Sequence, residues 1–123
     1  DPGGRLILLV EDDASVLEAL ALSLRLEGFR ILTARSGTEA LELARAQRPA
    51  VVVTDLVMPG LPALELIAEL SSGSPLGGPP VLVLSGRVQE EDRRRALEAG
   101  AARFLRKPCR VRLLVEALEE VLA

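Results

Sequence analysis

The residues of this sequence that could do chemistry are three acids, a hydroxyl and an ammonium, and each lies at or just after a short apolar run. Such runs predict buried β-strands. The set comprises Glu11, Asp12, Asp55, Ser85 and Lys107. In open parallel α/β sheets, ligands bind in the crevice outside the carboxyl ends of the strands. Residues in these positions are therefore the ones that such a fold would gather into a site.

Three carboxylates in one crevice repel one another unless a cation lies among them. The chain has no histidine and only one cysteine, so its available metal ligands are mainly oxygens. Oxygen ligands favour a hard cation, Mg²⁺ or Mn²⁺. The hydroxyl of Ser85 and the ammonium of Lys107 would lie beside that cation. This combination suits phosphoryl transfer, which depends mainly on positioning and charge neutralisation.

The acids also have a purely structural interpretation. Asp55 could cap the turn made by Met58-Pro59-Gly60, and Glu11 to Asp13 could supply negative charge to a helix N-terminus. Ser85 and Lys107 make this interpretation insufficient, because caps and helix charges need neither of them. Lys107 is the only lysine among fifteen Lys and Arg residues. Its isolation indicates a position that selects a compact ammonium over a guanidinium.

Composition limits the class of protein. A chain of 123 residues is long enough for one domain with a real core, and 49% hydrophobic with 27% charged residues exclude disorder. No apolar run approaches the roughly 18 residues of a membrane span. The net charge of −3 gives no basic footprint for nucleic acid. We expect a cytoplasmic domain over residues 5–123, preceded by a polar disordered tail or expression remnant at 1–4.

Five predicted strands alternate with five predicted helices, which implies a parallel α/β sheet covered by helices on both faces. The predicted strands are Arg5–Val10, Arg30–Ala34, Val51–Thr54, Val81–Leu84 and Ala102–Leu105. The predicted helices are Ala14–Glu27, 37–47, Leu64–Leu70, Gln89–Ala99 and Arg110–Leu122. Residues 71–80, rich in Gly and Pro, are predicted to form a long loop.

Two helix starts carry strong local signals. Asp13 is the natural N-cap of the first helix. Ser36 and Glu39 have the spacing of a capping box, which predicts the start of the second helix. Gly28 and Pro49 provide the corresponding stops.

Four motifs in order resemble the receiver (CheY-like) domain of bacterial two-component response regulators. They are Leu9-Val10-Glu11-Asp12-Asp13, Thr54-Asp55-Leu56-Val57-Met58-Pro59-Gly60, Leu84-Ser85-Gly86, and Ala99 to Pro108. Each motif alone is weak, but their order and spacing are specific. The resemblance covers Leu6 to Leu122. It implies a doubly wound (βα)₅ sandwich whose five parallel strands take the flavodoxin/CheY-like order 2-1-3-4-5.

The resemblance also implies a phosphorylation and metal site. Asp55 would be the phosphoacceptor. Asp12 and Asp55 would bind Mg²⁺ (or Mn²⁺) directly, Glu11 would act through water, and the backbone carbonyl of Val57 would be a further ligand.

Further roles carried over from the family concern the switch. Ser85 would hydrogen-bond the phosphoryl group, and Lys107 would pair with it. The peptide bond from Lys107 to Pro108 would be cis. Phe104 would be the aromatic that fills the space left when Ser85 is drawn toward the phosphoryl group, although a buried core aromatic has the same appearance in a sequence.

The implied function is that of a phosphorelay signalling domain rather than an enzyme. A histidine kinase or phosphotransfer protein would donate the phosphoryl group, and an output partner or effector domain would respond. The domain would not itself bind nucleic acid or a membrane. A homodimer could form through residues 89–99, 102–105 and 110–122. The cognate kinase, the output and the parent architecture stay open.

Two alternatives have distinct signatures. A Mg²⁺-dependent aspartyl-phosphate hydrolase typically carries a second Asp two residues after the nucleophile, where this chain has Val57. A non-phosphorylated pseudo-receiver would lack an acid, the hydroxyl or the lysine, and all are present here.

The sequence departs from the family pattern without losing a chemical residue. Pro62-Ala63 replaces a common Asp-Gly, so the start of the third helix could differ in shape, and Arg103 replaces a frequent Asp. Val57 and Arg87 occupy the positions that flank the path of a hydrolytic water in the family. Neither side chain can accept a proton from that water, which predicts a long-lived phosphoryl group.

Overall fold

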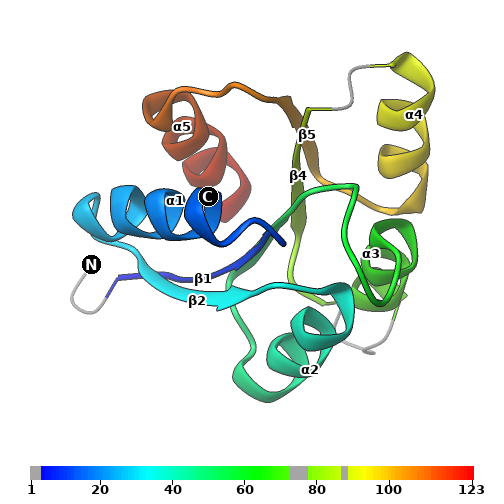
Figure 1. The fold of residues 1–123 in the computed structure, drawn as a ribbon, viewed down its shortest axis with the longest axis horizontal. Coiled ribbons are helices and arrows are strands. Elements are labelled where there is room, and N and C mark those ends of the chain that lie inside the picture. The colour runs from blue at the N-terminus through cyan, green and yellow to red at the C-terminus, as the bar shows by residue number, and fades with distance from the viewer. Residues whose placement is uncertain (1–3, 73–77, 87–88) are drawn as a thin grey trace.

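The protein is a five-stranded parallel sheet between two layers of helices (Figure 1). The computed structural model describes residues 4–72, 78–86 and 89–123. The strands lie in the order β2-β1-β3-β4-β5, which confirms the expected doubly wound topology. They are β1 (Leu6–Val10), β2 (Arg30–Ala34), β3 (Val51–Thr54), β4 (Val81–Ser85) and β5 (Arg103–Arg106).

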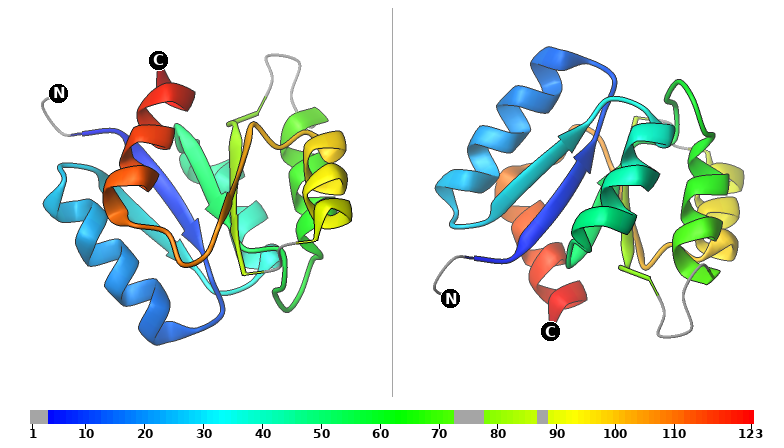
Figure 2. Two further views of the ribbon diagram at one scale, coloured as in Figure 1. Left: turned by 90° about the horizontal axis from the view of Figure 1, so that it is seen from above. Right: turned by 90° about the horizontal axis from the view of Figure 1, so that it is seen from below.

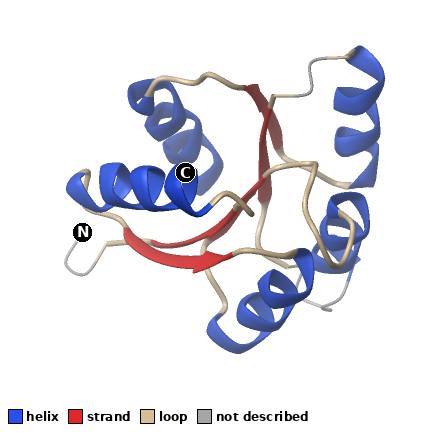
Figure 3. Cartoon of the chain, in the orientation of Figure 1, coloured by secondary structure: helices blue, strands red, loops and turns tan. Residues whose placement is uncertain are grey.

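The helices divide between the two faces of the sheet. They are α1 (Ala14–Leu26), α2 (Gly37–Gln47), α3 (Ala63–Ser72), α4 (Glu90–Ala99) and α5 (Val111–Leu122). Helices α1 and α5 cover one face, and α2, α3 and α4 lie side by side on the other (Figures 2 and 3). Within the part of the chain that the structure describes, none of them is long and apolar enough to cross a membrane.

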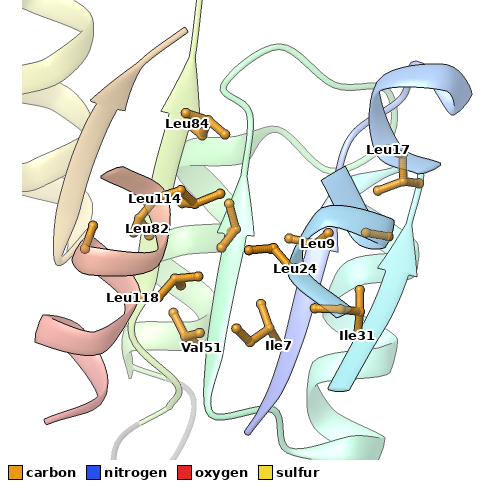
Figure 4. Packing of buried hydrophobic residues seen from close by; sticks show 13 residues of the cluster. Ile7, Leu9, Leu17, Leu24, Ile31, Val51, Leu82, Leu84, Leu114 and Leu118 are labelled. Carbon is orange, nitrogen blue, oxygen red and sulfur yellow. The ribbon is translucent and has the colours of Figure 1, made fainter. Parts of the chain in front are cut away.

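The core is split by the sheet into two apolar clusters. The central strands β1, β3 and β4 are buried almost throughout, as expected for parallel strands covered on both faces. One cluster lies under α1 and α5, where Leu24 and Leu118 pack over Ile7 and Val51 (Figure 4). The other, which includes Leu66 and Ile67 of α3, fills the opposite face. This packing makes the sheet a rigid support for the residues at its carboxyl edge.

The helix starts follow the predicted caps, with one difference. The Asp13 carboxylate accepts from the N–H of Val16 at 3.1 Å. The Ser36 hydroxyl accepts from the N–H of Glu39 at 3.1 Å. The Glu39 carboxylate, however, accepts from the N–H of Arg35 at 2.8 Å rather than from the N–H of Ser36. The capping interaction therefore reaches one residue further back, and it fixes the backbone of Arg35.

Boundary differences are small and lie at helix and strand ends. Helix α3 begins at Ala63 and reaches Ser72, beyond the predicted Leu64–Leu70. Pro62 lies immediately before α3, and its carbonyl accepts from the N–H of Leu66. Because an N–H at this position has no partner within the helix, its absence in proline costs no helical hydrogen bond. Ser85 is the last residue of β4 rather than the first after it. Residues 1–3 of the predicted tail and residues 73–77 of the predicted loop at 71–80 lie outside the described residues. Residues 71 and 72 belong to α3, so that part of the loop prediction was wrong.

Candidate phosphorylation site

The backbone sets the predicted residues in register at the carboxyl edge of the sheet. The N–H of Glu11 donates to Ala34, that of Asp55 to Val10, and that of Lys107 to Ser85, with donor–acceptor distances of 3.0, 3.3 and 2.9 Å. These bonds continue the parallel ladders one residue beyond the strands. Side chains from β1, β3, β4 and β5 are therefore brought to one edge by the fold itself.

Lys107 joins two of the predicted acids. Its Nζ lies 2.6 Å from Oε1 of Glu11 and 2.8 Å from Oδ2 of Asp55. The three side chains are mostly enclosed, with exposed fractions of 29% for Lys107, 10% for Glu11 and 15% for Asp55. Mostly enclosed charges require a partner, and the single positive charge of the ammonium serves both carboxylates.

The charge state of Lys107 follows from these contacts. Burial by itself lowers the pKa of the ammonium, but the hydrogen bonds and charges of Asp55 and Glu11 outweigh it. The net pKa of Lys107 lies above its usual range. Lys107 is therefore a fixed cation at neutral pH beside the carboxylate of Asp55.

Asp55 uses both carboxylate oxygens. Oδ2 pairs with Lys107, while Oδ1 accepts from the N–H groups of Leu56 at 2.6 Å and Val57 at 3.2 Å. The two backbone bonds meet the turn-capping interpretation of Asp55, while its role as phosphoacceptor or metal ligand stays a prediction. The two backbone bonds orient the carboxylate, and the lysine holds its outer oxygen.

The acidic pair is divided between a buried and an exposed residue. Glu11 is buried, and its second oxygen accepts from the N–H of Asp13 at 3.1 Å. Asp12 is exposed, and its backbone carbonyl accepts from Nε and Nη2 of Arg35 at 3.2 and 2.8 Å. We expected three carboxylates crowded around a metal ion. In the structure, Lys107 is instead the cation between Glu11 and Asp55.

The oxygens of Asp12, Asp55 and Val57 are the candidate ligands for a divalent cation. Among the described residues, no group of three or more His, Cys, Asp or Glu is arranged to bind a metal. Mg²⁺ does not need three carboxylates, because it keeps several waters and uses one or two carboxylates. The exposed Asp12, the mostly enclosed Asp55 and the Val57 carbonyl offer only oxygens, which fits that requirement.

Ser85 and Phe104 lie in adjacent strands. Ser85 is fully buried at the end of β4. Phe104, on β5, pairs in register with Val83 and packs partly buried against the apolar cluster under α3 and α4. Its position satisfies the core interpretation, and its role in a switch stays a prediction. The peptide bond between Lys107 and Pro108 is cis, as the resemblance implied.

Comparison with known proteins identifies the family. The model of the response regulator receiver domain matches residues 7–119. Response regulator MprA of Mycolicibacterium vanbaalenii is 42% identical over 118 residues, which are 95% of this chain and 47% of that protein. The probable transcriptional regulatory protein TcrX of Mycobacterium tuberculosis is 37% identical over 116 residues, 94% of this chain and 49% of that protein. The chain belongs to the response regulator receiver domain family.

The solved structures agree with this assignment. The chemotaxis response regulator CheY4 of Vibrio cholerae superposes with a TM-score of 0.88 at 28% identity, covering 97% of this chain and 99% of that one. The receiver domain described here is therefore a two-component signalling domain with the CheY-like fold. It spans about half the length of the curated relatives named above.

The loop after Asp55 in this receiver domain rests on the start of α2. The N–H of Gly37 donates to the Pro59 carbonyl at 3.1 Å, and the N–H of Leu61 donates to the Thr38 hydroxyl at 3.2 Å. Gly60 takes a positive φ of 79° between these two contacts. The loop that carries the Val57 carbonyl is thus attached to α2, which lies beside α3 on the same face of the sheet.

Sequence reasoning missed the residues that support the site from a distance. Arg35 and Gly37 had no recognisable signal beyond their place around the capping Ser36. Cys109, the single cysteine, packs beside the core, and burial raises the pKa of its thiol. A raised pKa lowers the thiolate fraction, which is the reactive form.

Proposed function

We propose that this receiver domain accepts a phosphoryl group on Asp55 from a histidine kinase or phosphotransfer protein. The observation that carries the proposal is the Lys107 ammonium, 2.8 Å from Oδ2 of Asp55 and 2.6 Å from Glu11 at the carboxyl edge of the sheet. In the transfer, the phosphorus–nitrogen bond of the donor's phosphohistidine breaks as an Asp55 oxygen bonds to phosphorus.

The surrounding residues have defined tasks in this proposal. The backbone N–H groups of Leu56 and Val57 orient the Asp55 carboxylate. Asp12, Asp55 and the Val57 carbonyl would hold Mg²⁺, with Glu11 acting through water, and the ion would supply positive charge for the phosphoryl oxygens. Lys107 pairs with one phosphoryl oxygen and Ser85 donates to another. Phosphorylation then shifts a conformational equilibrium that involves Ser85 and Phe104.

We assign the partners by the same reasoning. The curated relatives are about twice as long as this chain, which supports an effector domain as the output. The description of TcrX as a transcriptional regulator makes transcription the first output to test. We place the domain in the cytoplasm, where a kinase and this output could both reach it. A homodimer would use α4, β5 and α5.

Labelling of the wild-type domain tests the proposal. Incubation with acetyl phosphate should add one phosphoryl group per chain in Mg²⁺ or Mn²⁺ and none in EDTA, as measured by intact-mass spectrometry. Absence of any adduct would favour the pseudo-receiver. Sustained phosphate release from phosphomonoesters, which the receiver proposal does not expect, would favour the hydrolase.

We expect a slow loss of the phosphoryl group because of Val57. This residue, two positions after Asp55, is 54% exposed, and its side chain has no atom that could orient a water. Val57→Asn should accelerate decay of the phosphorylated domain about tenfold, equivalent to about 1.4 kcal/mol in the barrier. The measurement is the loss of the mass adduct after the donor is removed.

Val57→Leu is the matched control, because it stays apolar and should leave the decay rate near that of wild type. Equal decay of Val57→Asn and wild type would contradict this explanation of the lifetime. Arg87, the other residue predicted to flank the water path, lies outside the described residues.

A further inference from the structure

Arg35 makes a forked contact with the loop that carries the acidic pair. Its Nε and Nη2 donate to the same acceptor, the backbone carbonyl of Asp12, at 3.2 and 2.8 Å. The two residues come from different loops, one after β2 and one after β1. A planar guanidinium with parallel N–H groups fixes the direction of such a contact more tightly than an ammonium does.

The backbone of Arg35 is itself held in place. The N–H of Arg35 donates to the Glu39 carboxylate at 2.8 Å, and the Ser36 hydroxyl caps the same turn of α2. One residue before Arg35, the carbonyl of Ala34 accepts from the N–H of Glu11. Arg35 therefore reaches across from a backbone segment that is attached both to a helix and to the sheet.

Asp12 is the member of the acidic pair that needs such support. Glu11 is fixed by Lys107 and by the N–H of Asp13, and Asp13 is fixed as the cap of α1. Asp12 lies between them, and its exposed side chain extends from a backbone whose carbonyl is held by Arg35. The orientation of the Asp12 backbone determines where its carboxylate can reach.

We propose that Arg35 is a positioning residue for the divalent cation, and that its contact with the Asp12 carbonyl strengthens Mg²⁺ binding by holding Asp12 in place. The inference rests on the proposed function, because it assumes that Asp12 is a metal ligand. Groups that orient metal ligands without touching the metal commonly change its affinity by tenfold or more. The exposed position of Arg35 limits the effect here, so we expect a change of about 3- to 10-fold.

Charge and position make opposite predictions for this residue. A cation near the site repels Mg²⁺, so removal of the Arg35 charge would strengthen metal binding if charge alone mattered. Removal of the contact frees the Asp12 loop, which would weaken binding. The sign of the change in affinity therefore separates the two effects.

The test is the Mg²⁺ dissociation constant from isothermal titration calorimetry on the wild-type chain and three variants. Arg35→Gln should raise the constant about 3- to 10-fold. Arg35→Lys keeps the charge and one donor, so its constant should lie between those of wild type and Arg35→Gln. Arg45→Gln is the matched control, because it removes the same charge from α2 at an exposed ion pair with Glu69. Its constant should stay at or slightly below the wild-type value.

Stability in EDTA separates positioning from general structural damage. Arg35→Gln should unfold in urea near the wild-type midpoint while its Mg²⁺ constant rises. A constant that is unchanged or lower in Arg35→Gln would overturn the inference, as would a rise matched by Arg45→Gln. Failure of the wild-type chain itself to bind Mg²⁺ would instead contradict the proposed function, and with it this inference.

Discussion

The Asp55→Asn variant is expected to take up no phosphoryl group from acetyl phosphate in Mg²⁺, under conditions that label the wild-type domain. The nitrogen and oxygen of an amide are poorer nucleophiles than a carboxylate oxygen. The amide oxygen can still accept from the N–H groups of Leu56 and Val57, so the local turn should survive. The loss therefore concerns chemistry rather than folding, and intact-mass spectrometry measures it directly.

The same substitution should also change the contact with Lys107. The amide NH₂ would face the ammonium where Oδ2 of Asp55 now accepts at 2.8 Å. Two donors in that position cannot bond to each other, although Glu11 still pairs with the lysine. We expect a loss of about 1 kcal/mol in the free energy of unfolding.

Asp13→Asn provides the matched control for the acceptor. It removes one carboxylate close to the site, and asparagine caps a helix about as well as aspartate. Its labelling should equal that of wild type. If Asp55→Asn were still labelled, another acid would be the acceptor, and the assignment of Asp55 would be wrong while membership of the family would stand.

The fold was predictable because its signals are local. Arg30–Ala34 and Val51–Thr54 are short β-branched and apolar runs, and the structure has both strands with the predicted bounds. Asp13 and Ser36 mark helix starts through hydrogen bonds that span only three residues. The order of the strands came from the resemblance to the family, since periodicity alone does not determine it.

The site was predictable only in part. The positions of the strand ends predicted which side chains share one edge of the sheet. They did not predict which of the charged side chains would contact one another. Lys107 is 96 residues from Glu11 in the sequence. Only the folded structure shows that its ammonium lies between the carboxylates of Glu11 and Asp55. The contact between Arg35 and Asp12 also depends on how two loops pack together. The hydrophobic periodicity of the sequence contains no information about that packing.

Gly37 is the clearest case of a constraint that sequence rules would misjudge. At the first position of α2, replacement of glycine by alanine would be expected to stabilise the helix by up to about 1 kcal/mol. In the structure, a Cβ on Gly37 would lie 1.9 Å from the carbonyl oxygen and 2.9 Å from the carbonyl carbon of Leu61. These are backbone atoms, so no side-chain rotation can relieve the contact.

We therefore expect Gly37→Ala to destabilise the domain by about 2–3 kcal/mol, the upper part of the range for inserting a methylene into packed space. That is a large share of the roughly 5–15 kcal/mol available to a domain of this size. Urea unfolding should be followed by circular dichroism, because the chain has no Trp or Tyr. Gly86→Ala is the control, since a Cβ there would meet no atom within 4 Å.

The effect should extend to the chemistry, because the contact holds the loop that follows Asp55. If alanine displaces Leu61, it also strains the bond from Gly37 to Pro59 and moves the segment that carries the Val57 carbonyl. Without urea, and at a temperature at which both variants are fully folded, Gly37→Ala should therefore be labelled more slowly than Gly86→Ala. A Gly37→Ala domain as stable as wild type would show that the loop does not lie against α2, and the support described for the Asp55 loop would then be wrong.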